Sequence, residues 1–300
     1  MHVLRAGPLT TTWFPEHGMV GASLTHEGEE LLGQRGGLDA YLAKGSAFGI
    51  PLLAPWANRL AGLRYGEVEI RPQDAKLDAN GLPKDGAMAG RPWTIEEARE
   101  TTLTAAFESS PPVLAVFPFP HRLRVTAALT PTALTVTTEL TATGVVPVPV
   151  AFGWHPLFTL PGVPRERLEV VVPAVRESVL DPRGIPTGAA QERTFADGPL
   201  AARTADDEYP AVAGDLVLRG GGRELRVRFG APDYPVGHLW APEGQDFVAW
   251  EPMTAPTNAL VSHDGLRSVL PGRRFAATFT VLVGEQDGSD PFYSPRTSAT

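Results

Sequence analysis

Short segments in which apolar and polar residues alternate recur along the chain, and this feature constrains the fold more than any other. Residues 123–130 and 133–140 are two such segments, joined by Pro131-Thr132. Because side chains in a strand point alternately to opposite faces, the two segments predict an antiparallel hairpin. Residues 216–218 and 225–229, joined by three glycines, predict a second hairpin.

Further strands are predicted at 167–172 and 275–283, whereas convincing helical spacing is hard to find. Residues 96–107 include helix formers, but their threonines and irregular apolar spacing favour a strand. The 31 glycines and 30 prolines make up one fifth of the 300 residues, which suits many short strands and turns. These features predict one large antiparallel all-β domain over residues 1–300, with a polar tail that frays from about Gly284.

Charge and composition exclude several classes of function. The net charge is −8 and no cluster of Lys or Arg offsets it, so we expect no nucleic-acid partner. The chain has no cysteine, which excludes disulfides, thiolate metal sites and a cysteine nucleophile. Residues 1–12 lack a signal-peptide pattern, and the longest apolar stretch, 145–154, is too short to span a bilayer. We therefore expect a soluble, cytoplasmic protein without a membrane partner.

No motif indicates a metal, a cofactor or a phosphate-binding loop. The chain lacks His-x-His, HExxH and EF-hand patterns, and it lacks the GxSxG motif of serine hydrolases. The three glycines at 220–222 join two strands and precede no helix, unlike a phosphate loop. We expect neither a metal nor a cofactor.

Two titratable residues lie in apolar sequence and stand out as candidates for proton transfer. His155 lies in Ala-Phe-Gly-Trp-His-Pro-Leu-Phe, and Glu251 lies in Phe-Val-Ala-Trp-Glu-Pro-Met. Burial of a carboxylate is costly, so we expect the pKa of Glu251 to rise toward the value that a general base needs near neutrality. Both residues precede proline, which favours an extended backbone and narrows where each side chain points. The alternatives are a hydrogen-bonded core histidine and a strand-end glutamate in a salt bridge.

Four segments together resemble the aldose 1-epimerase (galactose mutarotase) family and occur in that family's order. They extend from about residue 15 to residue 283, nearly the whole chain. Any one of them alone is a weak signal, but the four in order are specific. The segments are Gly21–Leu32, Gly49–Leu60 with its Asn-Arg pair, Gly153–Phe158 with a Gly-x-His-Pro-aromatic motif, and Trp250–Ala259 with the glutamate motif.

The resemblance implies a galactose mutarotase-like β-sandwich with an open sugar groove on one sheet face. It also implies an enzyme that interconverts the α and β anomers of a free aldose. Glu251 would be the general base that takes the proton of the anomeric hydroxyl, and His155 the general acid that protonates the ring oxygen. Asn58 and Arg59 would bind the substrate, with Arg59 hydrogen-bonded to sugar hydroxyls. Such a reaction needs no redox partner and no metal.

The resemblance also points to two aspartates. One, which would bind another sugar hydroxyl, is placed at Asp206, although Asp207 fits almost as well. The family's second site histidine stands in a His-Gly pair, and that pair corresponds to Asp85-Gly86 in this chain. Asp85 can accept a hydrogen bond from a hydroxyl, but once ionised it cannot donate one to the ring oxygen.

Two other functions fit the same residues. One is a sugar-binding protein that lacks catalysis because of Asp85, and the other is a sugar-phosphate epimerase, which would need more groove cations than Arg59. Two roles are open for three of the tryptophans, a contact with the sugar's apolar face or a place in the hydrophobic core: Trp154, Trp240 and Trp250. The remaining histidines are expected to have structural or surface roles: His2, His17, His26, His121, His238 and His263.

Overall fold

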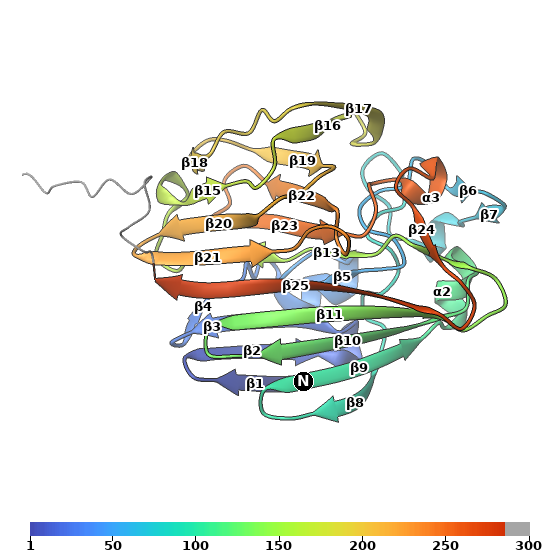
Figure 1. Ribbon diagram of the computed structural model, residues 1–300, viewed down its shortest axis with the longest axis horizontal. Helices are drawn as coiled ribbons and strands as arrows, with labels where there is room; N and C mark the ends of the chain where they lie inside the picture. The colour runs from blue at the N-terminus through green and yellow to red at the C-terminus, as the bar shows by residue number, and fades with distance from the viewer. Residues whose placement is uncertain (286–300) are drawn as a thin grey trace, which may run out of the picture.

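A computed structural model describes residues 1–285, and strands dominate it (Figure 1). The ladders that build its two largest sheets are antiparallel. The predicted antiparallel all-β fold is therefore confirmed. Within the described residues, no helix is long and apolar enough to cross a membrane.

The first layer is a nine-stranded sheet. Its middle strands bury every second side chain, as the sequence pattern predicts, because only one face of the sheet contacts the core. In spatial order its strands are β18 (Gly198–Pro199), β15 (Glu169–Val171), β20 (Asp215–Gly220), β21 (Arg223–Arg228), β25 (Arg274–Glu285), β11 (Ala133–Ala142), β10 (His121–Leu129), β9 (Thr102–Glu108) and β8 (Thr94–Ala98).

The second layer combines a six-stranded and a four-stranded sheet. Backbone hydrogen bonds between Gly21 and Ile50, of 3.1 and 2.7 Å, connect the two. The six-stranded sheet contains β19 (Ala205–Tyr209), β22 (Val236–Ala241), β23 (Val248–Met253), β13 (Gly153–Trp154) and β5 (Leu52–Leu53), with β14 (Leu157–Phe158) also paired to β23. The four-stranded sheet contains β1 (His2–Ala6), β2 (Leu9–Phe14), β3 (Val20–His26) and β4 (Glu29–Glu30).

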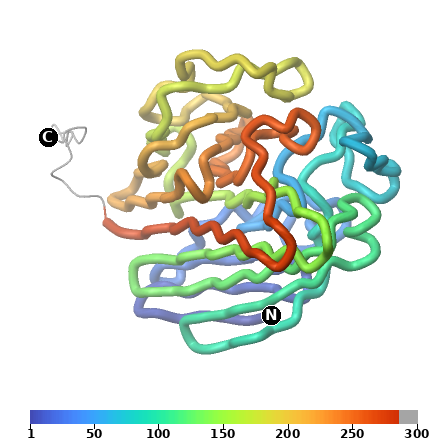
Figure 2. The backbone as a smooth tube through the Cα atoms, turned by 45° about the vertical axis from the view of Figure 1, so that its right-hand side comes forward, coloured from blue at the N-terminus to red at the C-terminus, as the bar shows by residue number. Residues whose placement is uncertain are grey.

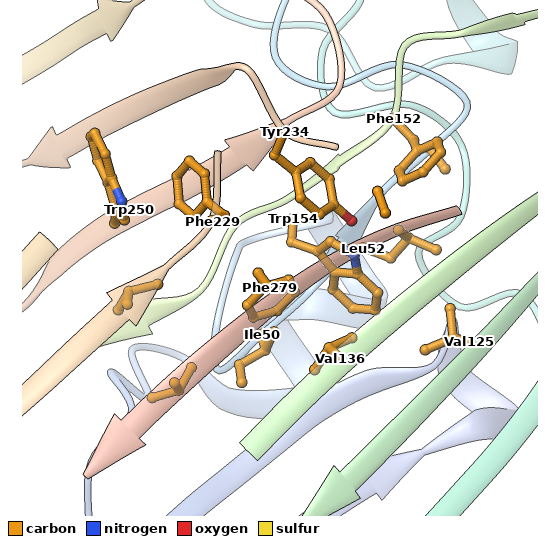
Figure 3. Close-up of a cluster of buried hydrophobic side chains, with 14 of the residues drawn as sticks. Ile50, Leu52, Val125, Val136, Phe152, Trp154, Phe229, Tyr234, Trp250 and Phe279 are labelled. Carbon is orange, nitrogen blue, oxygen red and sulfur yellow. The ribbon is translucent and has the colours of Figure 1, made fainter. Parts of the chain in front are cut away.

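The core lies between the two layers and is rich in aromatic side chains (Figure 3). Trp154 from the second layer contacts Phe279 of β25, with ring centroids 5.9 Å apart. Its indole N–H donates to the hydroxyl of Thr138 in β11 at 3.0 Å, so the buried donor is satisfied. Trp250 stacks on Phe229 at 5.3 Å. These contacts fix the inner face of the six-stranded sheet and leave its outer face for other residues.

Both predicted hairpins are confirmed, as β10–β11 and β20–β21, and residues 96–107 fall in β8 and β9 with a turn between them. The predicted strand at 167–172 is shorter, because residues 165–167 form a 3-10 turn. At the start of the tail predicted from about Gly284, Gly284 and Glu285 pair with β21. The rest of the predicted tail lies outside the described residues.

Within residues 1–285, three short helices are present that the sequence pattern did not predict. They escape prediction because each has at most eight residues, too few to establish a helical period. The helices are α1 (Gly37–Lys44), α2 (Pro111–Val116) and α3 (Ala259–Ser262), with 3-10 turns η1 (Pro15–His17), η2 (Pro72–Asp74) and η3 (Arg165–Arg167). The remaining strands form three pairs: β6 (Arg64–Tyr65) with β7 (Val68–Glu69), β12 (Val148–Val150) with β24 (Arg267–Val269), and β16 (Arg176–Leu180) with β17 (Pro186–Glu192).

Loops that are far apart in sequence meet at one end of the six-stranded sheet. Figure 2 shows the blue-to-cyan segment that follows β5 beside the orange-red segment that contains α3. The backbone N–H of Asn258 donates to the carbonyl of Arg59 at 2.9 Å, and the Asn258 side chain accepts from the N–H of Ala61 at 2.8 Å. This connection holds the loop that carries Asn58 and Arg59 against the sheet.

Candidate active site

The outer face of the six-stranded sheet carries three titratable side chains in neighbouring strands. His238 of β22 pairs directly with Glu251 of β23, and Asp206 of β19 pairs with Trp240, two residues beyond His238. Partners across a ladder share a face, so Glu251, His238 and Asp206 lie together. Trp250, the neighbour of Glu251 in β23, enters the core, so these three side chains point to the other face of the sheet.

His155 reaches the same face because β13 approaches β23 closely. A Cβ atom on Gly153 would lie 2.6 Å from the Pro252 carbonyl oxygen, so only glycine permits this approach. The N–H of His155 then donates to the Pro51 carbonyl at 3.0 Å, which fixes its backbone just beyond β13. As a result, Nε2 of His155 lies 3.2 Å from Oε1 of Glu251, with side chains only 6% and 3% exposed.

Burial shifts the pKa values of these two groups in opposite directions. It raises the pKa of Glu251 to about 7, as predicted from the sequence, and His238 opposes the rise when its ring is protonated. It lowers the pKa of His155 to about 3, although the negative charge of Asp85 favours the protonated ring. Because the two groups lie 3.2 Å apart, they titrate as a pair. Between about pH 3 and about pH 7 the pair holds one exchangeable proton.

Four side chains form a closed ring of hydrogen bonds beside this pair. Asp206 Oδ1 contacts His238 Nε2 at 2.8 Å, and Asn58 Nδ2 contacts His238 Nδ1 at 3.3 Å. Arg59 closes the ring by donating to Asn58 Oδ1 at 3.0 Å and to Asp206 Oδ2 at 3.5 Å. A further bond from Arg59 Nε to Asp78 Oδ2, 3.1 Å long, holds the guanidinium in place. The structure thus brings together Asn58, Arg59 and Asp206, which the sequence analysis assigned to substrate binding.

The ring also defines the protonation of His238. Because Asn58 turns its oxygen to Arg59, its amino group faces Nδ1, which must accept as part of a neutral imidazole. Burial favours that neutral form, whereas the bond to Asp206 and the charge of Glu251 raise the pKa of His238 above its ordinary value. Protonation at Nδ1 would require the Asn58 amide to turn and give up its bond with Arg59.

Asp206 and Asp207, the two alternatives left open by the sequence, occupy different environments. Asp206 takes part in the ring and is about half exposed, with its pKa held below the ordinary range by His238 and Arg59 against the effect of burial. Asp207 is the next residue in the strand and so points to the opposite face. Burial and the charge of Glu177 raise its pKa to about 6. The geometry favours Asp206 as the residue available to a ligand.

Asp85 lies beside the same pair on a loop that adjoins β5. Its N–H donates to the Asn58 carbonyl at 2.9 Å, and its side chain accepts from Lys76 Nζ at 2.6 Å. Burial opposes its ionisation, but the positive charges of Lys84 and Lys76 lower the pKa of Asp85 to about 2. The backbone is left-handed at Asp85, with φ of 63°. Only glycine can follow it, because a Cβ on Gly86 would lie 2.1 Å from the Ala54 carbonyl oxygen.

The sequence analysis missed two side chains of this site. His238 was grouped with structural or surface histidines, yet it is buried between Asn58 and Asp206. His238 lies in an apolar strand segment, as His155 does, so the same sequence feature could have identified it as a site residue. No feature of the sequence marks Lys84. An isolated backbone bridge pairs it with Arg59, which brings it to the site, and its charge acts on Glu251.

The three tryptophans considered for sugar contact divide between core and site. Trp154 and Trp250 are fully buried between the layers, so the core interpretation holds for both. Trp240 lies on the site face, where its ring meets that of His155 edge-on at 5.5 Å. Arg35 covers the Trp240 ring at 5.1 Å. Within residues 1–285, no group of three or more His, Asp or Glu side chains is placed to hold a metal ion.

A model of the aldose 1-epimerase family matches residues 3–280 of the chain. A galactose mutarotase-like protein from Clostridium acetobutylicum has the same fold, with a TM-score of 0.83, 14% identity and 95% of each chain covered. An aldose epimerase homologue from C. elegans has a TM-score of 0.79 at 16% identity, covering 95% of this chain and 99% of its own. A galactose 1-epimerase from Lactobacillus acidophilus has a TM-score of 0.72 at 15% identity, covering 94% and 93%. No curated protein sequence matches the chain.

Proposed function

The chain belongs to the aldose 1-epimerase family, and on that premise we propose that it interconverts the α and β anomers of a free aldose. One observation carries the proposal: a buried carboxylate and a buried imidazole lie 3.2 Å apart on the outer face of the six-stranded sheet. The anomeric oxygen and the ring oxygen of an aldose are bonded to the same carbon. A base for one and an acid for the other must therefore be close neighbours, as Glu251 and His155 are.

In the proposed reaction the shared proton, which the pKa values place on Glu251, first passes across the 3.2 Å contact to His155, so that Glu251 is ionised and His155 is protonated when the sugar reacts. Glu251 takes the proton of O1 while the bond between C1 and O5 breaks, and His155 gives its proton to O5. The open-chain aldehyde turns about the C1–C2 bond and closes on the other face, with both proton transfers reversed. Each transfer contributes roughly 10²–10⁴-fold, and fixed placement of both groups removes the entropic cost of bringing them together.

The ring of Asn58, His238, Asp206 and Arg59 supports sugar binding in this proposal. Asp206 is the most exposed member and can accept from a sugar hydroxyl, while Arg59 can donate to one. Trp240, beside His155, offers an apolar surface of the kind that sugar rings contact. These residues would hold the aldose with its anomeric carbon at the proton-transfer pair.

A free aldose fits the charges of the site better than a sugar phosphate. Arg59 is paired with Asp78 and Asp206, and Lys76 is paired with Asp85. Lys84 is the remaining lysine of the site. Because a phosphate dianion is ordinarily bound by several cations or by several charge-assisted hydrogen bonds, one lysine is too few. The hypothesis of a sugar-phosphate epimerase is therefore the weaker one.

Polarimetry tests the proposal directly. Freshly dissolved α-glucose and α-galactose should approach their equilibrium rotation at a rate that rises in proportion to the protein concentration. Calorimetry on the same sugars measures binding independently. A protein that binds them without changing the rate would be a sugar-binding protein, and the proposed activity would be wrong.

A further inference from the structure

Glu208 of β19 is a buried carboxylate that the proposed reaction does not use. It pairs with His238 across the ladder of β19 and β22, so it lies on the sheet face that carries the candidate site. The residue is 1% exposed, and both carboxylate oxygens accept hydrogen bonds from uncharged groups. Burial of a carboxylate is costly unless such bonds compensate for the lost water. The two donors therefore indicate what Glu208 holds in place.

The first donor is part of the segment that holds the Arg59 loop. Oε2 of Glu208 accepts from the backbone N–H of Thr257 at 2.7 Å. The next residue, Asn258, has a left-handed backbone with φ of 70°. Asn258 binds the loop at two points, because its N–H donates to the Arg59 carbonyl at 2.9 Å and its side chain accepts from the N–H of Ala61 at 2.8 Å. A fixed Thr257 thus keeps Asn258 in the conformation that binds the loop.

The second donor belongs to the hairpin of β16 and β17, which lies beside β19 (Figure 1). Oε1 of the same carboxylate accepts from the hydroxyl of Ser178 in β16 at 2.9 Å. The turn of the hairpin reaches the same loop, since a Cβ atom on Gly184 would lie 3.1 Å from Nη1 of Arg59. Arg183 of that turn also donates to the Ala61 carbonyl at 3.4 Å. The bond to the serine therefore anchors a hairpin whose turn adjoins the guanidinium.

Both connections end at Arg59, which the proposed function assigns to sugar binding. Its guanidinium donates to Asn58 at 3.0 Å and to Asp206 at 3.5 Å, as part of the ring of four side chains. An arginine side chain has many rotamers, so one that is ordered beforehand loses less conformational entropy when a ligand binds. Such ordering favours the bound sugar and the transition state equally, and it therefore lowers KM without changing kcat.

We propose that Glu208 is a positioning residue that orders Arg59 for sugar binding. It does so from two sides, through Thr257 and the segment that holds the Arg59 loop, and through Ser178 and the hairpin that adjoins the guanidinium. The inference rests on the proposed function and extends it to a residue that acts through other groups. A residue with a purely structural role would change stability alone, whereas a positioning residue must also change KM.

Saturation kinetics of mutarotation compare two changes at this position. Glu208→Ala removes both bonds and should raise KM by about tenfold, as expected for hydrogen bonds to a charged group, while kcat stays within about threefold. In Glu208→Gln the amide oxygen accepts from Thr257 and the amino group donates to the Ser178 oxygen, so KM should stay within about twofold of wild type. A fall in kcat with an unchanged KM would overturn the positioning role. Equal rises in KM for the two variants would overturn it as well, because the charge that acts on His238 would then matter and not the bonds.

A pair of hairpin variants isolates the connection through β16. Ser178→Ala removes only the bond between the hairpin and Glu208, and it should raise KM by about fivefold. Thr187→Ala in β17 is the matched control, because its hydroxyl donates to the Val179 carbonyl at 2.9 Å within the hairpin, and it should stay within about twofold of wild type. Equal rises in KM would assign the effect to the stability of the hairpin and would overturn the inference. An unchanged KM in Ser178→Ala would do the same.

Hydrogen exchange of backbone amides tests the positioning without any sugar. The N–H groups of Asn258 and Ala61, which make the bonds between the two segments, should exchange about tenfold faster in Glu208→Ala than in wild type. The N–H of Leu129, hydrogen-bonded in the nine-stranded layer, is the control and should exchange at the wild-type rate. Ser178→Ala provides the same comparison if Glu208→Ala does not fold. An equal acceleration at Leu129 would indicate a general loss of stability and would overturn the inference.

The exchange rates also separate this inference from the proposed function. If no sugar mutarotates but the amides of Asn258 and Ala61 exchange faster in the variant, the proposed function fails and the positioning of the loop stands. If sugars mutarotate but these amides exchange as in wild type, the positioning role of Glu208 fails alone.

Discussion

Nε2 of His155 lies 3.2 Å from Oε1 of Glu251, and each group is buried against the other. The contact joins the residue that follows β13 to the middle of β23. The raised pKa of Glu251 and the lowered pKa of His155 place the shared proton on Glu251, from which it can cross the contact to His155. A substrate bound beside the pair meets both groups in place, and transfer of the proton to His155 makes Glu251 the base and His155 the acid.

Replacement of Glu251 by glutamine should lower kcat/KM for mutarotation by roughly 10²-fold or more, because the amide keeps the shape but cannot act as a base. Polarimetry on α-galactose measures the loss, and thermal unfolding checks that the fold is kept. Glu243→Gln, in an exposed turn, is the control and should behave as wild type. A Glu251→Gln variant within about threefold of wild type would remove Glu251 from the role of base.

Replacement of His155 by asparagine should lower kcat by roughly 10²-fold and change KM by less than about threefold. The reason is that the proton donor matters most when charge develops on O5 in the transition state. Saturation kinetics followed by optical rotation separate the two constants. His263→Asn, at an exposed position with a left-handed backbone that asparagine tolerates, is the control. An unchanged kcat with a raised KM would make His155 a binding residue.

Activity should fall as the pH rises through about 7, because the pair then loses its one proton and keeps a base without an acid. It should also fall toward pH 3, where protonation of both groups leaves no base. A profile of kcat/KM from pH 4 to 9 measures the first limb, and activity that climbs between pH 6 and 8 would contradict the assignment. Besides His155, which contacts it, the charged and titratable groups that act most strongly on Glu251 are His238, Asp85, Lys84 and Asp206.

Replacement of Lys84 by methionine should move the whole pH profile to higher pH. The charge of Lys84 lowers the pKa of both Glu251 and His155, so its removal lets each hold a proton more strongly. Comparison of the two pH profiles measures the displacement. Lys44→Met, an exposed change in α1, serves as the control and should leave the profile in place. A Lys84→Met profile that coincides with wild type would show that this lysine does not face the pair.

Asp206→Asn should raise KM by about tenfold with a smaller effect on kcat, since the carboxylate would no longer accept charge-assisted hydrogen bonds from a sugar hydroxyl. Asp207→Asn changes the adjacent side chain on the opposite face and should stay within about twofold of wild type. Steady-state kinetics on one aldose compare the two variants. The reverse order of effects would assign the binding role to Asp207.

Local sequence patterns predicted most of the architecture. The alternation in β10, β11 and β25 is visible in the sequence, because a strand repeats every two residues whatever its partner is. The short helix α1 was missed because it is too short to show a period of its own. Tertiary contacts order its few residues. The core positions of Trp154 and Trp250 also needed the structure, because an aromatic residue in a strand can face either side.

The sequence by itself indicated an antiparallel β protein with a titratable residue in each of two apolar motifs, and those apolar neighbours predicted that the pKa of Glu251 would rise. These properties depend on neighbours along the chain. Only the tertiary structure decided that His238 joins Asn58, Arg59 and Asp206 in one ring, and that Asp85 pairs with Lys76. The physical reason is that strand register and loop contacts join segments distant in sequence, and local residue patterns do not show which distant groups will meet.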